Sequence, residues 1–207
     1  MKYYLDITLL PDAEANLGFL WQKVFQQVHI ALVDNKIGDN ESAIALAIVQ
    51  YADKDFPLGD KLRLFAANED QLTQLNIGKW LSRLRDYCHV SSIKAVPDNV
   101  RKFACFKQKR VKGLGRVESQ LRRKAKHISQ KFNVEYEKCL TELKAKSQYV
   151  KSSLPFIHVE SQQTKKRLGN DGQSMFPLFI ERELSGQLVS GSFDCYGLSK
   201  TATVPLF

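Results

Sequence analysis

The sequence lacks long apolar runs, metal-binding motifs and glycine-rich phosphate loops. No apolar segment approaches the roughly 20 residues that a membrane-spanning helix needs, and Asp6 stands where a signal peptide would be apolar. The cysteines do not have the paired spacing of a zinc site or of a disulfide framework. We therefore expect a cytoplasmic protein with reduced thiols that does not bind a membrane and needs neither a metal nor another cofactor.

Acidic residues are scarce in one stretch of the chain. Residues 101–131 hold 12 Lys and Arg against a single acid, Glu118, whereas residues 1–100 hold 10 against 13 and residues 132–207 hold 9 against 8. The net charge of +9 therefore comes from this one stretch. A run of charge is usually a solvated face, but one glutamate cannot neutralise twelve cations. A concentrated basic segment beside a near-neutral body indicates a nucleic-acid partner.

Apolar patterns and turn residues in the N-terminal half of the chain predict the order strand, helix, two strands, helix, strand. This order is typical of the ferredoxin-like βαββαβ fold, and we expect such a domain over residues 1–98. Apolar residues at three-four spacing after Asn16 predict the first helix. The second helix is expected over residues 69–84, and the strands over residues 2–10, 43–51, 61–67 and 88–96.

In the C-terminal half, the sequence predicts a smaller α+β domain over residues 99–207. We therefore expect the whole chain to be α+β. A strand over residues 101–110 mixes aromatic and basic side chains, which favours RNA over DNA. The Arg-rich helix expected at about 116–131 has an apolar stripe that would dock on the body and leave its cations facing outwards. A second helix is expected over residues 135–146, and short strands over 156–161, 176–181 and 187–196.

Among the four histidines, His29 stands out by its position. It lies about 100° round the helical wheel from Val28, beside Phe25, where a helix leaves the core and lines a cleft. A lone helical histidine is more often a packing or surface residue. Without metal ligands, the chemistry that suits a single histidine is RNA transesterification, in which a base takes the proton from a 2′-hydroxyl and the oxygen attacks the adjacent phosphorus. Ser161 and Tyr196, taken alone, are ordinary residues.

Short motifs occur in order along the whole chain. They are YLDI at residues 4–7, LPD at 10–12, VHIAL at 28–32, AVP at 95–97, Gln108 with the Arg-rich helix, PF at 155–156, SQ at 161–162, FPLFI at 176–180, CYGLSK at 195–200 and VP at 204–205. In this order they resemble the CRISPR-associated endoribonucleases of the type I-F (Csy) system, the Cas-six-f family. The combination is specific although each motif is short.

The resemblance implies a metal-independent enzyme that cuts precursor CRISPR RNA at the base of the repeat hairpin. It implies a cyclic phosphate and a 5′-hydroxyl as products, and an enzyme that stays bound to the crRNA hairpin as a subunit of the type I-F surveillance complex. The partners would be the repeat RNA hairpin and the other subunits of that complex, and no stable homo-oligomer is expected. By position, His29 would be the catalytic base, Ser161 would hold the nucleotide at the cut, and Tyr196 would orient the histidine.

The resemblance also implies RNA-binding residues. Phe176 would stack on the terminal base pair, and the basic helix would lie in the major groove of the hairpin through residues that include Arg116, Arg122, Arg123 and Lys126. The family commonly reads bases with an Arg and a Gln two residues apart. Here Gln108 matches the Gln, but Phe106 stands at the Arg position. Either Lys107 or Lys109 substitutes, or the register shifts by one, or this protein reads its repeat differently.

Two other functions compete with the enzyme. The chain could be a non-catalytic RNA-hairpin-binding subunit of a ribonucleoprotein complex, or a basic DNA-binding regulator that binds duplex DNA as tightly as an RNA hairpin. The joint presence of His29, Ser161 and Tyr196 favours the enzyme over the binding subunit.

Overall fold

The computed structural model describes residues 1–53, 55–147, 152–161 and 175–207. The chain is α+β, as predicted, and its contacts divide it into two units, Met1–Lys109 with Leu154–Phe207, and Arg110–Ser153. The division predicted after residue 98 and the ferredoxin-like class of the N-terminal half stay predictions. Within the described ranges, no helix is long and apolar enough to cross a membrane.

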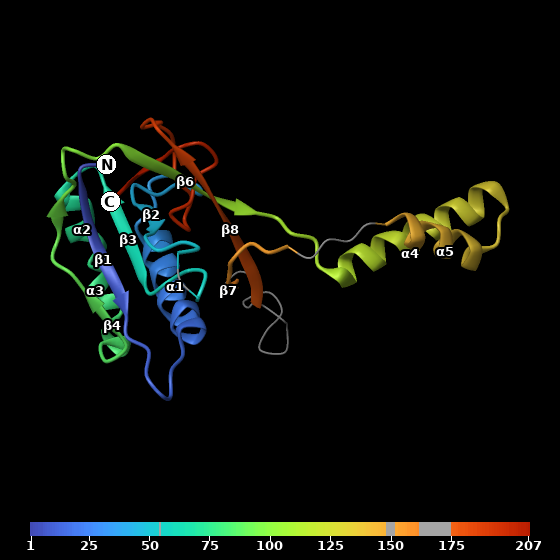
Figure 1. Ribbon diagram of the computed structural model, residues 1–207, viewed down its shortest axis with the longest axis horizontal. Helices are drawn as coiled ribbons and strands as arrows, with labels where there is room; N and C mark the ends of the chain where they lie inside the picture. The colour runs from blue at the N-terminus through green and yellow to red at the C-terminus, as the bar shows by residue number, and fades with distance from the viewer. Residues whose placement is uncertain (54, 148–151, 162–174) are drawn as a thin grey trace. The chain divides into compact units, whose positions relative to one another are not determined.

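The N-terminal half forms an antiparallel sheet in the order β2-β3-β1-β4, with β5 also paired to β1 (Figure 1). Alternate residues of β1, namely Leu5, Ile7 and Leu9, are buried, as the two-residue repeat of a strand requires when one face meets a core. The strands are β1 (Tyr3–Leu9), β2 (Ala45–Ile48), β3 (Lys61–Ala66), β4 (Cys88–Val90) and β5 (Lys94–Ala95).

Helix α1 (Leu17–Asp34) begins as the sequence predicts. The side chain of its N-cap, Asn16, accepts a hydrogen bond of 3.0 Å from the N–H of Phe19, which satisfies one of the free donors of the first turn. Its apolar stripe, from Leu20 to Leu32, is buried in the core. His29 lies at the border of that stripe and is half-buried. The predicted flank position of this histidine is therefore confirmed.

The single helix predicted over residues 69–84 is wrong. The structure has α2 (Glu69–Leu75), α3 (Ile77–Trp80) and a 3-10 turn over Ser82–Leu84. Asn76 takes a left-handed conformation with φ of 44°, which asparagine tolerates better than most residues and which ends α2. The strand predicted over 88–96 is likewise two short strands, β4 and β5.

A second antiparallel sheet has the order β7-β8-β6-β9 and belongs to the same unit (Figure 1). Its strands are β6 (Lys102–Lys109), β7 (Phe156–Glu160), β8 (Met175–Ser185) and β9 (Val204–Leu206). The strand predicted over residues 187–196 is wrong, because side chains satisfy the backbone there: the hydroxyl of Ser199, for example, donates to the carbonyl of Ser192 at 2.7 Å. Strand β9 was not predicted, and β8 is longer than expected.

The loop over residues 194–199 is bonded to both sheets. The N–H of Leu46 on β2 donates to the carbonyl of Gly197 at 2.8 Å, and the N–H of Ser199 donates to the carbonyl of Phe106 on β6 at 3.0 Å. Gly197 has φ of 73°, and a Cβ there would lie 2.7 Å from the Cβ of Leu46. Only glycine fits this approach, and the loop therefore places Tyr196 in a defined position.

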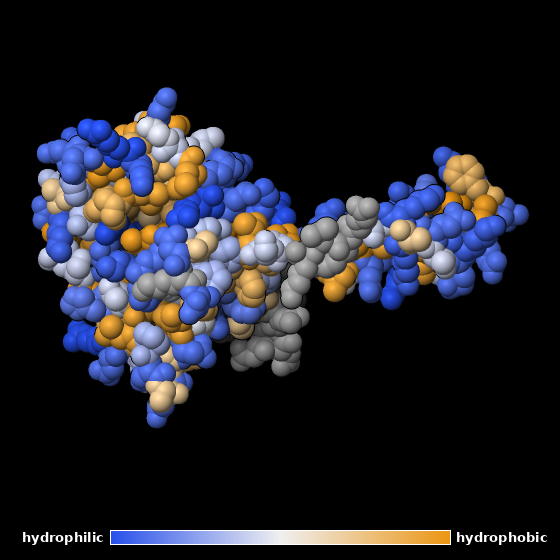
Figure 2. Space-filling model, in the orientation of Figure 1, coloured by the Kyte–Doolittle hydropathy of each residue, from blue (hydrophilic) through white to orange (hydrophobic). Residues whose placement is uncertain are grey.

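The second unit contains α4 (Leu114–Phe132) and α5 (Tyr136–Lys146), joined at Asn133, which has φ of 52°. The predicted basic helix is confirmed, and it begins at Leu114, slightly before the expected start at about residue 116. Its apolar stripe packs against α5 within this unit, where the sequence predicted docking on the body. Ala125, Cys139 and Leu140 form the buried centre of this packing. Figure 2 shows that most of the visible surface of α4 and α5 is hydrophilic.

We expect the change Gly197→Ala to destabilise the protein by roughly 1 to 3 kcal/mol, because an alanine there combines an unfavourable backbone conformation with overlap against Leu46. The change Gly186→Ala is the matched control, since a Cβ at Gly186 would meet nothing within 4 Å. Urea unfolding of both variants tests this. Equal midpoints for the two variants would contradict the role assigned to Gly197.

Candidate active site and nucleic-acid interface

His29 is held by two groups of the 194–199 loop. Its Nδ1 lies 2.8 Å from the carbonyl oxygen of Cys195, and its ring stacks on the ring of Tyr196 with centroids 4.1 Å apart and planes 13° apart. The ring of Phe25 lies nearly parallel to that of Tyr196, at 6.3 Å. His29 and Tyr196, two of the three residues expected in the catalytic site, are therefore in contact. They are far apart in the sequence: 166 positions separate His29 from Cys195, the residue before Tyr196.

The carbonyl of Cys195 selects the tautomer of His29. A carbonyl oxygen can only accept a hydrogen bond, so Nδ1 carries the proton. In the neutral ring, Nε2 then keeps its lone pair and can accept a proton from another molecule. This is the arrangement that a general base requires.

Burial sets the charge state of His29. Burial lowers the pKa of the imidazole from the ordinary 6.5, and the bond to the Cys195 carbonyl and the charge of Asp194 oppose this effect only in part. The ring is therefore mainly neutral at pH 7. Burial also raises the pKa of the Tyr196 phenol, helped by the charges of Asp194 and Cys195, so this ring stays uncharged beside the histidine.

Ser161, the third expected catalytic residue, directly follows β7, and the residue before it is tied to α1. The side chain of Gln26 accepts from the N–H of Glu160 at 2.8 Å and donates to the carbonyl of Glu160 at 3.3 Å. Because Gln26 and His29 are three residues apart, they share one face of α1. Gln26 is not among the predicted site residues, and its spacing from His29 was the available signal.

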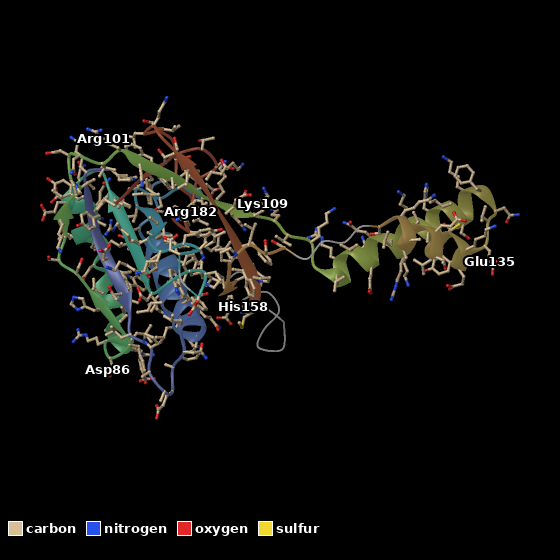
Figure 3. All side chains as sticks on the ribbon, in the orientation of Figure 1. Asp86, Arg101, Lys109, Glu135, His158 and Arg182 are labelled. Carbon is tan, nitrogen blue, oxygen red and sulfur yellow. The ribbon has the colours of Figure 1, made fainter. Side chains whose placement is uncertain are left out.

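The β6 residues expected to read bases have partners within the sheet. Lys107 forms an ion pair with Glu183, and Lys109 forms one with Glu181 at 2.8 Å. Figure 3 shows Lys109 at the end of β6. Gln108 is exposed. Exposed ion pairs of this kind are worth at most about 1 kcal/mol, so another anion can compete for these lysines.

Phe106 cannot serve as a reader of bases in this fold. Only 3% of it is exposed, and its ring contacts the edge of the Tyr51 ring with centroids 6.2 Å apart. The position where the resemblance leads one to expect an arginine is therefore part of the core. Substitution by Lys107 or Lys109, a register shifted by one, and a different way of reading the repeat all stay predictions.

The basic face of α4 is exposed and nearly free of acids. Arg116, Arg122, Arg123 and Lys126 are all exposed, and the single acid of the helix, Glu118, lies 3.9 Å from Arg122. Side chains of α4 and α5 line a hollow of about 480 Å³, and its lining includes Arg122, Arg123, Lys126 and Tyr136. The face thus offers several cations to one polyanion.

Phe176 lies on β8, which belongs to the other unit of the chain. It pairs with Val159 of β7 in the sheet register, and its partly buried ring packs against the main core. Among the residues that the structure describes, no three His, Cys, Asp or Glu side chains gather as metal ligands. The metal-independent reaction and the roles of the expected site residues stay predictions.

The fold and the site together define an α+β protein with a neutral, oriented histidine and a separate basic helix. The family model of the CRISPR-associated protein Cas_Csy4 matches residues 4–207. The chain therefore belongs to this CRISPR-associated family, and the family predicted from the motifs is confirmed.

Two relatives are similar over their whole length. The CRISPR-associated endonuclease Cas6/Csy4 of Pseudomonas aeruginosa (strain UCBPP-PA14) is 32% identical over 209 residues, covering 100% of both chains. The protein of the same name from Escherichia coli (strain UTI89 / UPEC) is 29% identical over 208 residues, again covering 100% of both chains. The predicted enzyme class, a nuclease, is confirmed by this family membership.

We expect His29 to titrate with a midpoint below 6.5 in the free protein, because burial disfavours the imidazolium. The neutral ring should carry its proton on Nδ1. Nitrogen-15 chemical shifts of the histidines, followed from pH 4 to pH 8, measure both properties. A midpoint at or above 6.5, or a proton on Nε2 of the neutral ring, would contradict the site as described.

Proposed function

We propose that this protein is a metal-independent endoribonuclease that cuts precursor CRISPR RNA within its repeat hairpins, with His29 as the general base. The observation that carries the proposal is the hydrogen bond from His29 Nδ1 to the Cys195 carbonyl, which leaves Nε2 as the acceptor. The names of the relatives support a nuclease of the CRISPR system. Product retention, and membership of the type I-F surveillance complex, belong to the same proposal.

In the proposed reaction, Nε2 of His29 takes the proton of the 2′-hydroxyl next to the cut. The 2′-oxygen attacks the adjacent phosphorus, and the bond from phosphorus to the 5′-oxygen breaks. The 2′-oxygen and the phosphorus stay joined in a cyclic phosphate, and the leaving oxygen takes a proton to become a 5′-hydroxyl. Ser161 holds the nucleotide at the cut, and Tyr196 keeps the imidazole plane fixed.

Binding is proposed to rest on residues distinct from the base. The cations of α4 contact the phosphates of the hairpin, and the exposed Gln108 with Lys107 or Lys109 contacts its bases. Phe176 stacks on the terminal base pair. The scarcity of acids on α4, where Glu118 is the single one, supports this division, because phosphate neutralises its mutually repelling cations.

We expect the change His29→Ala to abolish cutting of a cognate repeat hairpin in excess EDTA while the dissociation constant for that hairpin changes less than about threefold, since α4 is untouched. His89→Ala is the matched control, because His89 is exposed on β4. Single-turnover cutting and filter binding measure the two quantities. A hairpin with hydrogen in place of the 2′-hydroxyl at the cut should bind and stay intact.

Three other results of this experiment would contradict the proposed enzyme or its mechanism. Tight binding without cutting by the wild-type protein would contradict the enzyme and support the non-catalytic binding subunit. Equal affinity for duplex DNA would support the DNA-binding regulator. Cutting of the 2′-deoxy hairpin would contradict transesterification.

We expect the triple change Arg122→Ala, Arg123→Ala and Lys126→Ala to weaken hairpin binding by tenfold or more, because phosphate contacts supply most of the affinity. The plot of log affinity against log salt should lose roughly 0.7 to 0.9 of slope for each phosphate contact removed. Lys144→Ala, an exposed cation on α5, is the matched control. An unchanged slope in the triple variant would contradict the assignment of α4 to the hairpin.

A further inference from the structure

Asp194 begins the loop that holds His29, and its carboxylate closes that loop. Its Oδ1 accepts the N–H of Tyr196 at 2.8 Å and the N–H of Leu198 at 3.0 Å. The backbone N–H of Asp194 donates to the carbonyl of Leu198 at 2.8 Å, and its carbonyl accepts the N–H of Gly197 at 2.8 Å. Four hydrogen bonds therefore fold five residues around one half-buried side chain.

The two groups that contact His29 lie inside this closed loop. Cys195 supplies the carbonyl that fixes the tautomer, and Tyr196 supplies the ring that stacks on the imidazole. Both residues lie between Asp194 and Leu198, so loss of the carboxylate bonds would free both at once. The orientation of His29 thus depends on a side chain that the sequence analysis did not single out.

We propose that Asp194 is the positioning residue of His29: its carboxylate holds the loop against the imidazole, and its negative charge stabilises the imidazolium that forms when Nε2 accepts a proton. The inference rests on the proposed function for its effect on cutting. It extends the site from the three residues expected there to a fourth that does not touch RNA.

The electrostatics of the site agree with this role. Burial disfavours the charged imidazole and lowers its pKa, whereas the charge of Asp194 favours it and raises its pKa. The same attraction lowers the pKa of Asp194, which burial raises, and the two N–H donors favour its ionised form. Asp194 therefore offsets part of the cost of placing a positive charge on a buried ring.

Other ionisable groups belong to the elements around this pair. Cys195 and Tyr196 lie on the loop itself, Glu160 ends β7 with its backbone bonded to Gln26, and Lys36 and Asp39 follow α1. Lys36 and Asp39 act on the thiol of Cys195 with opposite signs. The charge of Asp194 acts directly on His29.

The change Asp194→Asn separates the two parts of the role. Asparagine keeps an Oδ1 that accepts both N–H groups, so the loop stays closed, but the charge is lost. We expect the midpoint of His29, followed by NMR in the free protein, to fall by a few tenths to about one pH unit. The acid limb of the pH profile for single-turnover cutting should move down by the same amount, with hairpin affinity unchanged.

Two further variants complete the experiment. The change Asp194→Ala removes charge and bonds together, and cutting should fall by about tenfold or more at every pH because the imidazole loses its fixed orientation. The change Asp39→Asn removes a nearby exposed carboxylate that does not bond to the loop, and it should leave the profile of His29 unchanged.

The NMR measurement decides the inference independently of RNA cutting. An Asp194→Asn variant with the wild-type midpoint for His29 would overturn the electrostatic role, whether or not the protein cuts RNA. If the Asp194→Asn variant has a lowered midpoint for His29 and the wild-type protein cuts no hairpin, the link between Asp194 and His29 is upheld. The proposed function is then overturned instead.

Discussion

A hydrogen bond of 2.8 Å between His29 Nδ1 and the carbonyl oxygen of Cys195 joins the two segments of the chain that form the candidate site. It links the first helix to the loop after the last long strand. The bond selects the tautomer of the imidazole, and the stacked ring of Tyr196 restricts its plane. An imidazole fixed in this way has little freedom left to lose, and such preorganisation is what the proposed general base needs.

The loop can hold His29 because it is itself held from three sides. Strand β2 bonds it at Gly197, strand β6 bonds it at Ser199, and the carboxylate of Asp194 closes it from within. The packing at Gly197 is too close for any side chain. The two sheets of the unit therefore act as one support for the site, and a substitution in either sheet can disturb the base without touching it.

Sequence patterns predicted the features that depend on local order. The spacing of the apolar residues from Leu20 to Leu32 predicts α1, and the run of cations predicts the basic face of α4; both helices are present. The break at Asn76 was not predicted because a left-handed residue leaves no periodic signal in the sequence. The irregular loop after β8 was not predicted because hydrogen bonds from side chain to backbone leave none either. The contact between Gln26 and Glu160 depends on the fold; the spacing of Gln26 from His29 shows only that the two share a face of α1. His29 and Tyr196 were paired through a family resemblance, not through spacing.

The proposed chemistry and the proposed binding depend on different physical properties of this protein. His29 as a base depends on burial and orientation, whereas RNA binding by α4 depends on unneutralised charge, so we expect that the two can be altered separately. We propose above all that His29 activates a 2′-hydroxyl. Mass spectrometry of the fragments of a repeat hairpin, cut in excess EDTA, tests this. Attack by a 2′-oxygen leaves a cyclic phosphate on the upstream fragment and a 5′-hydroxyl on the downstream fragment. A 5′-phosphate with a free 3′-hydroxyl would contradict it, because water would then have been the nucleophile.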